Sequence, residues 1–485
     1  MNVPFRGSLD AMSEANGLPI DPVRVIAALF ASVFLAPLSH GLSSPSLRPS
    51  SSPASFSPSL ISLSLLGHLW NAVLGLASAW FCFDVLVVHS LASTLFTYAA
   101  IHLAPRAHVG TIVTVFVFGH LLYANALREI YNVVMMWDGA QMVLCLKLVG
   151  TAISYGDGGR AADKKTSLML RNQLVEKPSL LALFGYIYFY PTFLAGPVFE
   201  FNDYVAWVVE RRSAPVSVLV RNLVLTVVVI VGYGVSDVFF NVATMDTPAF
   251  YPTVPPFARL LLQCVAVMLY RMRFYMVWQL GETAAALAGY GYMADSNDWD
   301  GLRNNNILLV ECPTNFRVGI NNWNIRVSVW LSTYVYQRLG LKNGRPTGRS
   351  TLYTFLVSAL WHGFLPGYYQ FFVMGAIYSE LGKVLRRRFR PYFHYTEDRK
   401  AHPYAIFWEY TDASKASRFA VVYDLGGMFL TWTMMQYIGL SFVLQDMTRC
   451  YYMWRSVNFL PHIIPVVLLA GLSLTEPKAI KAKVV

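Results

Sequence analysis

Long apolar segments alternate with short, basic stretches along most of this chain of 485 residues. A run of about 20 mostly apolar residues is long enough to form a helix that crosses a bilayer. The pattern predicts about eleven such helices, at residues 22–39, 60–79, 81–104, 109–127, 130–153, 179–199, 217–241, 257–281, 351–382, 421–445 and 454–474. We therefore expect an all-α polytopic membrane protein.

The composition agrees with this pattern. Hydrophobic residues make up 55% of the chain and charged residues 13%, against roughly 45–50% and about 25% in soluble domains. Much of the formal charge of +11 lies in short loops, where basic residues report orientation and no nucleic acid need be invoked as a partner. The five cysteines lie far apart without a CxxC pair, so neither a disulfide framework nor a metal site is supported.

The same pattern predicts one membrane domain. It occupies residues 22–475, between a polar N-terminal segment at 1–21 and a basic tail at 476–485. Residues 41–59 are rich in Ser and Pro, which is typical of a mobile connector. The first apolar segment has no convincing small-residue cleavage site, so we interpret it as a retained helix rather than a removed signal.

Three basic loops predict the orientation of the chain. By the positive-inside rule they face the cytosol; they are residues 156–179, 338–349 and 383–400. Because two of them flank residues 350–382, we expect this stretch to form a hairpin that is bent near Pro366 and Gly367. Segment 179–199 is ambiguous, because the following Arg211 and Arg212 fall outside the cytosol if it spans, so a re-entrant segment is the alternative.

The chain ends in KAKVV, with Lys481 and Lys483 in a K-x-K-x-x pattern. This pattern resembles the dilysine signal for retrieval to the endoplasmic reticulum, although random basic tails look the same. Two further spans after the loop at 383–400 bring the C-terminus back to the cytosol. We therefore expect a multi-pass protein of the endoplasmic reticulum membrane with a cytosolic C-terminus.

A histidine lies inside one of the apolar segments, in residues 361–369 (WHGFLPGYY). His362 would lie about 12 residues, or roughly 18 Å, from the cytosolic end of its helix. A titratable group at this depth is costly unless something uses it. With an ordinary pKa of about 6.5, His362 can take and return a proton, while Gly363 and Pro366 would open the backbone into a cavity. On this segment alone, an active-site base and a buried histidine bonded to a neighbouring helix are both open.

A second candidate lies upstream, in residues 315–331 (NFRVGINNWNIRVSVWL). This stretch is too polar to span and too apolar for a free loop, so we expect an amphipathic or re-entrant helix. Asn324 could hold a hydroxyl or a carbonyl oxygen beside a catalytic base. Taken alone, it is equally well explained as the polar side of an interfacial helix.

These two elements together resemble the membrane-bound O-acyltransferase (MBOAT) family, in particular its lysophospholipid acyltransferase branch. The elements that carry the resemblance are Trp323-Asn324, WHGxxPGYY at 361–369, Trp137-Asp138 with Gln141, Met142 and Lys147, PTFLAGP at 191–197, and RMRFY at 271–275 with Trp278 and Glu282. They cover roughly residues 110–475. The RRFRP stretch at 387–391 is most similar to fungal broad-specificity members.

Some positions depart from the usual motifs of this branch. Val327 stands where the branch commonly has Thr, Ser332 where it has Arg, and Arg273 and Phe274 where it has Lys and Tyr. These departures leave the head-group preference open, and they affect neither His362 nor Asn324.

The resemblance implies an MBOAT fold with re-entrant helices around a central catalytic chamber. It also implies transfer of an acyl group from acyl-CoA to the free hydroxyl, mainly sn-2, of a lysophospholipid. His362 is the implied general base and Asn324 the orienting or oxyanion residue. The implied substrate-binding residues are Trp323, Trp361, Gly363, Pro366, Tyr368, Arg271, Arg273, Tyr275 and Lys147. For Arg271, Arg273 and Lys147, an ordinary helix-end or buried ion-pair role is at least as well supported.

The implied partners are acyl-CoA, a lysophospholipid and membrane lipids. No cofactor is demanded beyond acyl-CoA as co-substrate, because the thiolate is a good leaving group. A homodimer is compatible with the sequence, which does not decide the oligomeric state. Two alternatives remain: an MBOAT enzyme that acylates a protein or a sterol, and a transporter with His362 in a proton relay. The transporter predicts internal repeats between the two halves of the chain, and we find none.

Overall fold

The computed structural model describes residues 10–11, 20–41, 58–131, 137–210, 212–239, 254–294, 296–340, 348–393 and 419–474. Within these ranges the chain is helical and contains no strand, and one isolated β-bridge joins Met293 to Asp298. The prediction of an all-α fold is confirmed. Most of the predicted connector at 41–59, most of the segment at 1–21 and the whole tail at 476–485 lie outside the described residues.

Six helical segments of the described chain are long and apolar enough to cross a membrane. They are Pro22–Ser39, Ser64–Leu103, Arg106–Tyr131, Val216–Ser236, Phe257–Leu287 and Ala420–Leu444. Met447–Arg455 and Leu460–Leu472 form a pair bent by 80°, which makes seven if the pair is one span. The protein is thus a multi-pass membrane protein, but the predicted number of eleven spans is not confirmed.

Two predicted spans are too short or are interrupted in the structure. Segment 179–199 forms a helix only over α8 (Leu180–Ile187), which at about 1.5 Å per residue is far shorter than the bilayer core. Segment 351–382 is divided into α18 (Gly348–His362) and α19 (Pro366–Phe389). In both segments Gly and Pro follow the point where the helix ends, which explains the interruption.

The described chain falls into two compact units, and each is described by itself. Unit 1 takes residues 1–230, 273–304 and 329–335, and unit 2 takes residues 231–272, 305–328 and 336–485. The predicted extent of one membrane domain at 22–475 stays a prediction.

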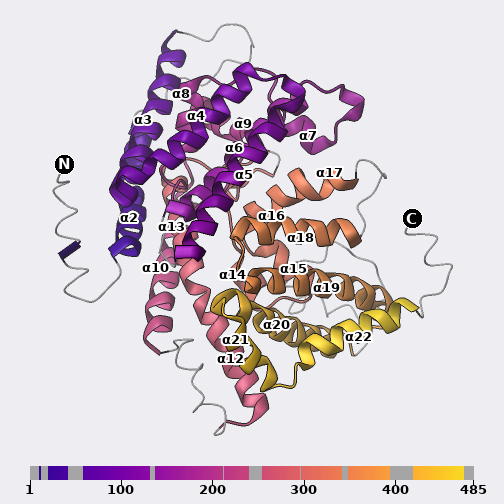
Figure 1. Cartoon of the computed structure of the whole chain (residues 1–485). Coiled ribbons are helices and arrows are strands. Elements are labelled where there is room, and N and C mark those ends of the chain that lie inside the picture. Colours follow the sequence, from indigo (N-terminus) through magenta and orange to yellow (C-terminus); the bar gives the residue numbers. More distant parts are fainter. Residues whose placement is uncertain are drawn as a thin grey trace. The chain divides into compact units, whose positions relative to one another are not determined.

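Unit 1 contains the helices drawn from indigo to magenta in Figure 1, together with the pink α10 and α13. They are α2 (Ile20–Gly41), α3 (Pro58–Phe83), α4 (Val87–Leu103), α5 (Arg106–Tyr131), α6 (Trp137–Gly158), α7 (Ser167–Asn172), α8, α9 (Phe201–Glu210), most of α10 (Val216–Phe239) and nearly all of α13 (Met272–Leu287). Helix α5 packs on α6, and it buries apolar side chains at every fourth position, including Val109, Val113 and Val117. Such spacing places them on one face of the helix.

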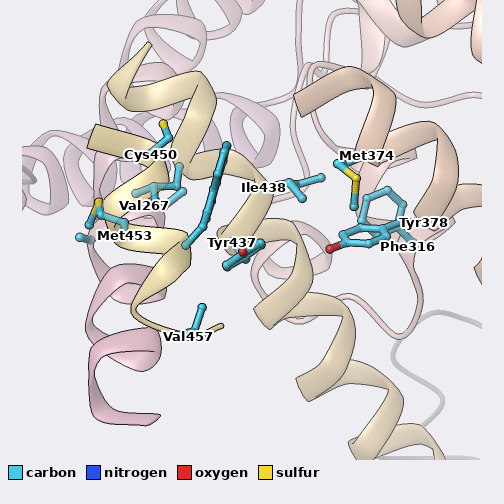
Figure 2. Close-up of a cluster of buried hydrophobic side chains, with 12 residues drawn as sticks. Val267, Phe316, Met374, Tyr378, Tyr437, Ile438, Cys450, Met453 and Val457 are labelled. Carbon is cyan, nitrogen blue, oxygen red and sulfur yellow. The ribbon is translucent and has the colours of Figure 1, made fainter. Parts of the chain in front are cut away.

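Unit 2 contains α12 (Pro256–Tyr270), α14 (Ile307–Glu311), α15 (Phe316–Asn322), α17 (Gln337–Gly340), α18, α19, α20 (Ala420–Leu444), α21 (Met447–Arg455) and α22 (Leu460–Leu474). Its core is a cluster of apolar side chains around α20. In Figure 2, Tyr437 and Ile438 of α20 lie between Met374 and Tyr378 on one side and Met453 on the other. Helix α20 is therefore the central element against which α12 and α19 pack.

Candidate active site

His362 is the last residue of α18, directly before a break in the helical backbone. Gly363 follows with φ +123°, and its N–H donates to the carbonyls of Ala359 and Leu360 at 3.2 and 3.1 Å. L side chains rarely adopt this backbone conformation, so glycine suits the position. Pro366 then begins α19, where a missing N–H costs no helical hydrogen bond. The break thus lies at 363–365, slightly before the predicted bend.

Aromatic rings surround the His362 imidazole. Its ring centroid lies 4.7 Å from that of Trp361, 5.4 Å from those of Tyr368 and Phe372, and 5.0 Å from that of Phe442. The Phe372 ring is stacked on the imidazole and the Phe442 ring meets it edge-on. His362 itself is half-buried. These contacts hold the imidazole in one orientation without covering it completely.

The start of α19 lies directly against the end of α20. A Cβ placed on Gly367 would come within 2.3 Å of the Ser441 carbonyl oxygen, so a larger residue would push the two helices apart. Tyr368 follows in α19 with 7% of its surface exposed. Glycine at 367 therefore allows the close approach that brings Tyr368 and Phe442 to the imidazole.

Asn324 occupies the junction between α15 and α16 (Ile325–Leu331). Its φ of +44° lies in the left-handed region, which Asn adopts more readily than most side chains. Its backbone N–H donates to Oδ1 of Asn305 at 3.2 Å, and its carbonyl accepts from the Ser328 N–H at 3.0 Å. Within the described residues its half-buried side-chain amide makes no hydrogen bond, so this amide can serve a ligand.

Asn324 and His362 belong to the same unit. Helix α15, which ends just before Asn324, packs against α19, which begins just after His362. Phe316 of α15 meets Tyr378 of α19 edge-on at 5.4 Å. Trp323 is half-buried at the end of α15. Unit 2 therefore contains both predicted catalytic residues and all the predicted binding residues of the Trp323-Asn324 element and of the WHGxxPGYY motif at 361–369.

Arg271 also lies in unit 2, where it is buried in an ion pair. Its Nε and Nη2 donate to the two carboxylate oxygens of Glu311 at 3.1 and 2.5 Å, and its Nη1 donates to Oε1 of Gln436. This is the buried ion-pair role that the sequence left open. A contact between Arg271 and a phosphate stays a prediction.

Lys147, Arg273 and Tyr275 lie in unit 1. Lys147 is 1% exposed, and its Nζ donates to the carbonyls of Tyr186 and Ile187 at 2.7 and 3.4 Å. The same Nζ lies over the ring of Tyr186 at 4.6 Å and over that of Phe199 at 4.4 Å. Tyr275 is also buried, and Arg273 is half-buried. The structure therefore assigns these three residues to a different unit from His362.

In unit 1 the PTFLAGP segment at 191–197 is in direct contact with α13. Trp278 donates from Nε1 to the Ala195 carbonyl of the PTFLAGP segment at 3.1 Å, and Glu282 accepts from the Asn304 N–H at 2.8 Å. A Cβ on Gly281 would lie 2.7 Å from the Gly196 carbonyl oxygen. The two motifs that are separated in sequence thus pack against each other.

Sequence reasoning missed a set of polar side chains that bond to Asn324, Arg271 or Tyr368, or to one another beside Tyr368. They are Asn305, Glu311, Gln370, Gln436, Ser441, Gln445 and His462. A signal was present for some of them. Polar residues recur on one face of an otherwise apolar segment at 433–445, and such residues are costly at bilayer depth.

The comparison with known proteins decides the family. Residues 122–411 match the sequence model of MBOAT, the membrane-bound O-acyltransferase family. This chain belongs to that family. The matched residues include His362 and Asn324, and the family prediction made from the motifs is confirmed. As an MBOAT protein, the chain is an acyltransferase.

Relatives of this MBOAT protein carry related names. The chain is 30% identical over 404 residues to the lysophospholipid acyltransferase of Schizosaccharomyces pombe. The aligned residues cover 78% of this chain and 75% of the relative. It is also 30% identical over 411 residues to the lysophospholipid acyltransferase of Saccharomyces cerevisiae, and the aligned residues cover 77% of this chain and 63% of the relative. It is 25% identical to human membrane-bound glycerophospholipid O-acyltransferase 1, and the aligned residues cover 97% of this chain and 92% of the relative.

Proposed function

We propose that this protein is an acyl-CoA-dependent lysophospholipid O-acyltransferase. It transfers a fatty acyl chain to the free hydroxyl of a lysophospholipid, mainly at sn-2, in phospholipid synthesis and remodelling. The observation that carries the proposal is the half-buried His362 at the break between α18 and α19, inside the region that matches the MBOAT family. The names of the two fungal relatives support the acceptor class.

The reaction needs one group that moves a proton. A hydroxyl attacks the thioester carbonyl, and a ring nitrogen of His362 takes the hydroxyl proton as the new C–O bond forms. The tetrahedral intermediate then expels the coenzyme A thiolate, which receives that proton, so the histidine returns to its neutral form. A well-placed general base contributes typically 10² to 10⁴ in rate.

Asn324 is the proposed orienting residue. Its side-chain amide can donate to the oxyanion or hold the attacking hydroxyl, and removal of one such donor costs about 10² to 10³ in kcat. The left-handed backbone at Asn324 is braced on both sides by Asn305 and Ser328. A backbone held in this way keeps the amide in place while negative charge develops on the oxygen of the thioester carbonyl.

The two substrates divide between the membrane and the cytosol. We propose that the phosphates of acyl-CoA meet cytosolic cations, for which Arg271, Arg273 and Lys147 are candidates, while the acyl chains lie at bilayer depth. The residues of the two motifs in unit 2, namely Trp323, Trp361, Gly363, Pro366 and Tyr368, are the proposed walls of the binding site, and Tyr275 of unit 1 is a separate candidate for a substrate contact. We place the protein in the endoplasmic reticulum with its C-terminus in the cytosol.

The test is an acyl-transfer assay on membranes from cells that lack other such activity. Radiolabelled acyl-CoA is supplied with lysophosphatidylcholine, lysophosphatidylethanolamine or lysophosphatidylserine, and labelled diacyl phospholipid is measured. We expect product from the wild-type chain and none from His362→Ala at equal expression. Label appearing in protein or in sterol ester, with no phospholipid product, would instead support the other acceptor classes. No labelled phospholipid with any of the three acceptors would overturn the proposed function.

A further inference from the structure

Helix α20 carries a row of polar side chains through the core of unit 2. Thr433, Tyr437 and Ser441 lie four residues apart, Gln436 lies three residues after Thr433, and Gln445 follows at the C-terminal end. Gln436 is 1% exposed and Ser441 is fully buried. Polar groups in a segment apolar enough to span a bilayer mark a functional site by default, although they can also serve as contacts between helices. Their partners decide between these roles.

The first partner lies beside His362. Gln445 ends α20 with φ +57°, a conformation that L side chains rarely adopt. From there its Nε2 donates to the Tyr368 hydroxyl at 2.5 Å. The Tyr368 ring lies 5.4 Å from the imidazole of His362. The amide of Gln445 thus reaches the catalytic histidine through one intermediate ring, without touching it.

A second polar connection holds the same turn of α19. Gln370, two residues after Tyr368, accepts from the Ser441 hydroxyl, and its Nε2 lies 2.8 Å from Nε2 of His462 in α22. The other ring nitrogen of His462 lies 2.8 Å from the Tyr437 hydroxyl. If Gln370 donates to His462, the imidazole accepts at Nε2 and donates from Nδ1, so each group is satisfied. Helices α19, α20 and α22 are thereby joined at the level of the catalytic segment.

We propose that Gln445 is a positioning residue of the active site. It holds the Tyr368 hydroxyl, so that the Tyr368 ring fixes the orientation of the His362 imidazole, while the Gln370 and His462 connection holds the turn of α19 that carries Tyr368. This inference rests on the proposed function of His362 as general base. Orientation matters because a misplacement of about 1 Å can cost 10²-fold in rate.

The test is a double-mutant cycle of Tyr368→Phe and Gln445→Leu in purified full-length protein, with kcat and KM measured for acyl transfer to a lysophospholipid. Both single variants should lower kcat about tenfold and leave both KM values within about twofold. Because the two changes remove the same interaction, the double variant should be no slower than the slower single variant. Tyr368→Phe keeps the ring and its volume, so it tests the hydroxyl even if Gln445→Leu does not fold.

Tyr378→Phe is the matched control. Tyr378 is another buried tyrosine of α19, and its hydroxyl donates to the Pro461 carbonyl at 2.6 Å. We expect this variant to lose stability but to keep kcat per folded molecule, because its hydroxyl does not contact the rings around His362. A purely structural role for Gln445 would make its variant behave like this control.

The two proposals fail in different ways. Wild-type kcat in both single variants, or a double variant slowed by the product of the single effects, would overturn the positioning role while the wild-type enzyme remains active. A larger KM with unchanged kcat would also overturn it, because Gln445 would then serve binding. A wild-type chain that transfers no acyl group would overturn the proposed function, and the positioning role with it.

Discussion

Two basic side chains in this protein are surrounded by aromatic rings, and the contrast between them separates anchoring from catalysis. Lys147 in unit 1 is fully enclosed, and its Nζ contacts two backbone carbonyls and two ring faces. His362 in unit 2 is half-buried beside a helix break, with Gly363 in a left-handed conformation. An enclosed amine whose hydrogen bonds are satisfied stabilises its surroundings, whereas a partly open imidazole next to a broken helix can exchange protons with a ligand.

The largest expected effect is that of His362→Ala on turnover. We predict a loss of at least 10² to 10⁴ in acyl-transfer rate, because the proton acceptor is removed. Expression and membrane insertion should not change, since the break at Gly363 remains. The matched control is His108→Ala, which removes an exposed histidine near the start of α5. Normal turnover in the His362 variant would show that His362, like Lys147, is not the catalytic base.

Asn324→Ala sharpens the catalytic side of the comparison. We predict a fall in kcat of about 10² to 10³, corresponding to about 2.7–4 kcal/mol for a lost oxyanion donor. Asn324→Asp should be no better, because a partly buried negative charge replaces a donor. Asn321→Ala changes a nearby exposed amide of α15 and should be neutral. If Asn324→Ala lowers expression while the activity per molecule persists, Asn324 is structural.

Lys147→Met tests the anchoring side. Loss of the hydrogen bonds to the carbonyls of Tyr186 and Ile187 should reduce the free energy of unfolding by about 0.5–1.5 kcal/mol for each bond, seen as a lower unfolding temperature in detergent. If Lys147 only anchors the fold and does not contact a phosphate, activity per folded molecule should stay within about twofold of wild type. Lys177→Met is the control, because Lys177 also donates to a carbonyl, that of His102 at 3.1 Å, from an exposed position. Unchanged stability with a higher KM for acyl-CoA would instead make Lys147 a phosphate contact.

The smallest expected effect concerns location and leaves both sites intact. Changing Lys481 and Lys483 to Ser should move part of the protein forward from the endoplasmic reticulum. The measurement is microscopy of the protein against a co-expressed marker of the endoplasmic reticulum. A glycosylation acceptor placed at 390–400 or after Val485 should stay unmodified if these segments are cytosolic. Glycosylation at the C-terminus would contradict the orientation, whereas an unchanged location after the Lys changes would contradict only the retrieval signal.

Several elements were predictable because they depend on local sequence. The apolar segments at 22–39, 109–127, 217–241 and 421–445 correspond closely to α2, α5, α10 and α20. The break after His362 follows from Gly363 and Pro366, which act through their own backbone restrictions. The family was predictable from motifs, which the match over residues 122–411 confirms.

The number of membrane crossings was not predictable from the same pattern. Segment 130–153 is apolar, but in the structure its residues 137–153 fall in α6, which is buried on nearly all sides within unit 1. An apolar run describes burial and does not say whether lipid or protein covers the helix. Segment 179–199 shows the same limit, because only eight of its residues form a helix.

The sequence by itself determined that this is a helical membrane protein with a histidine beside a helix break, because apolar periodicity, glycine and proline act locally, and its motifs indicated the acyltransferase family. Only the tertiary structure decided which polar groups meet. Arg271 pairs with Glu311 40 residues away, Lys147 contacts Tyr186 39 residues away, and Gln445 reaches Tyr368 across 77 residues. Such pairs depend on which helix faces pack together. A single sequence does not encode that choice in any local pattern, since the free energy comes from burial and hydrogen bonding summed over the whole fold.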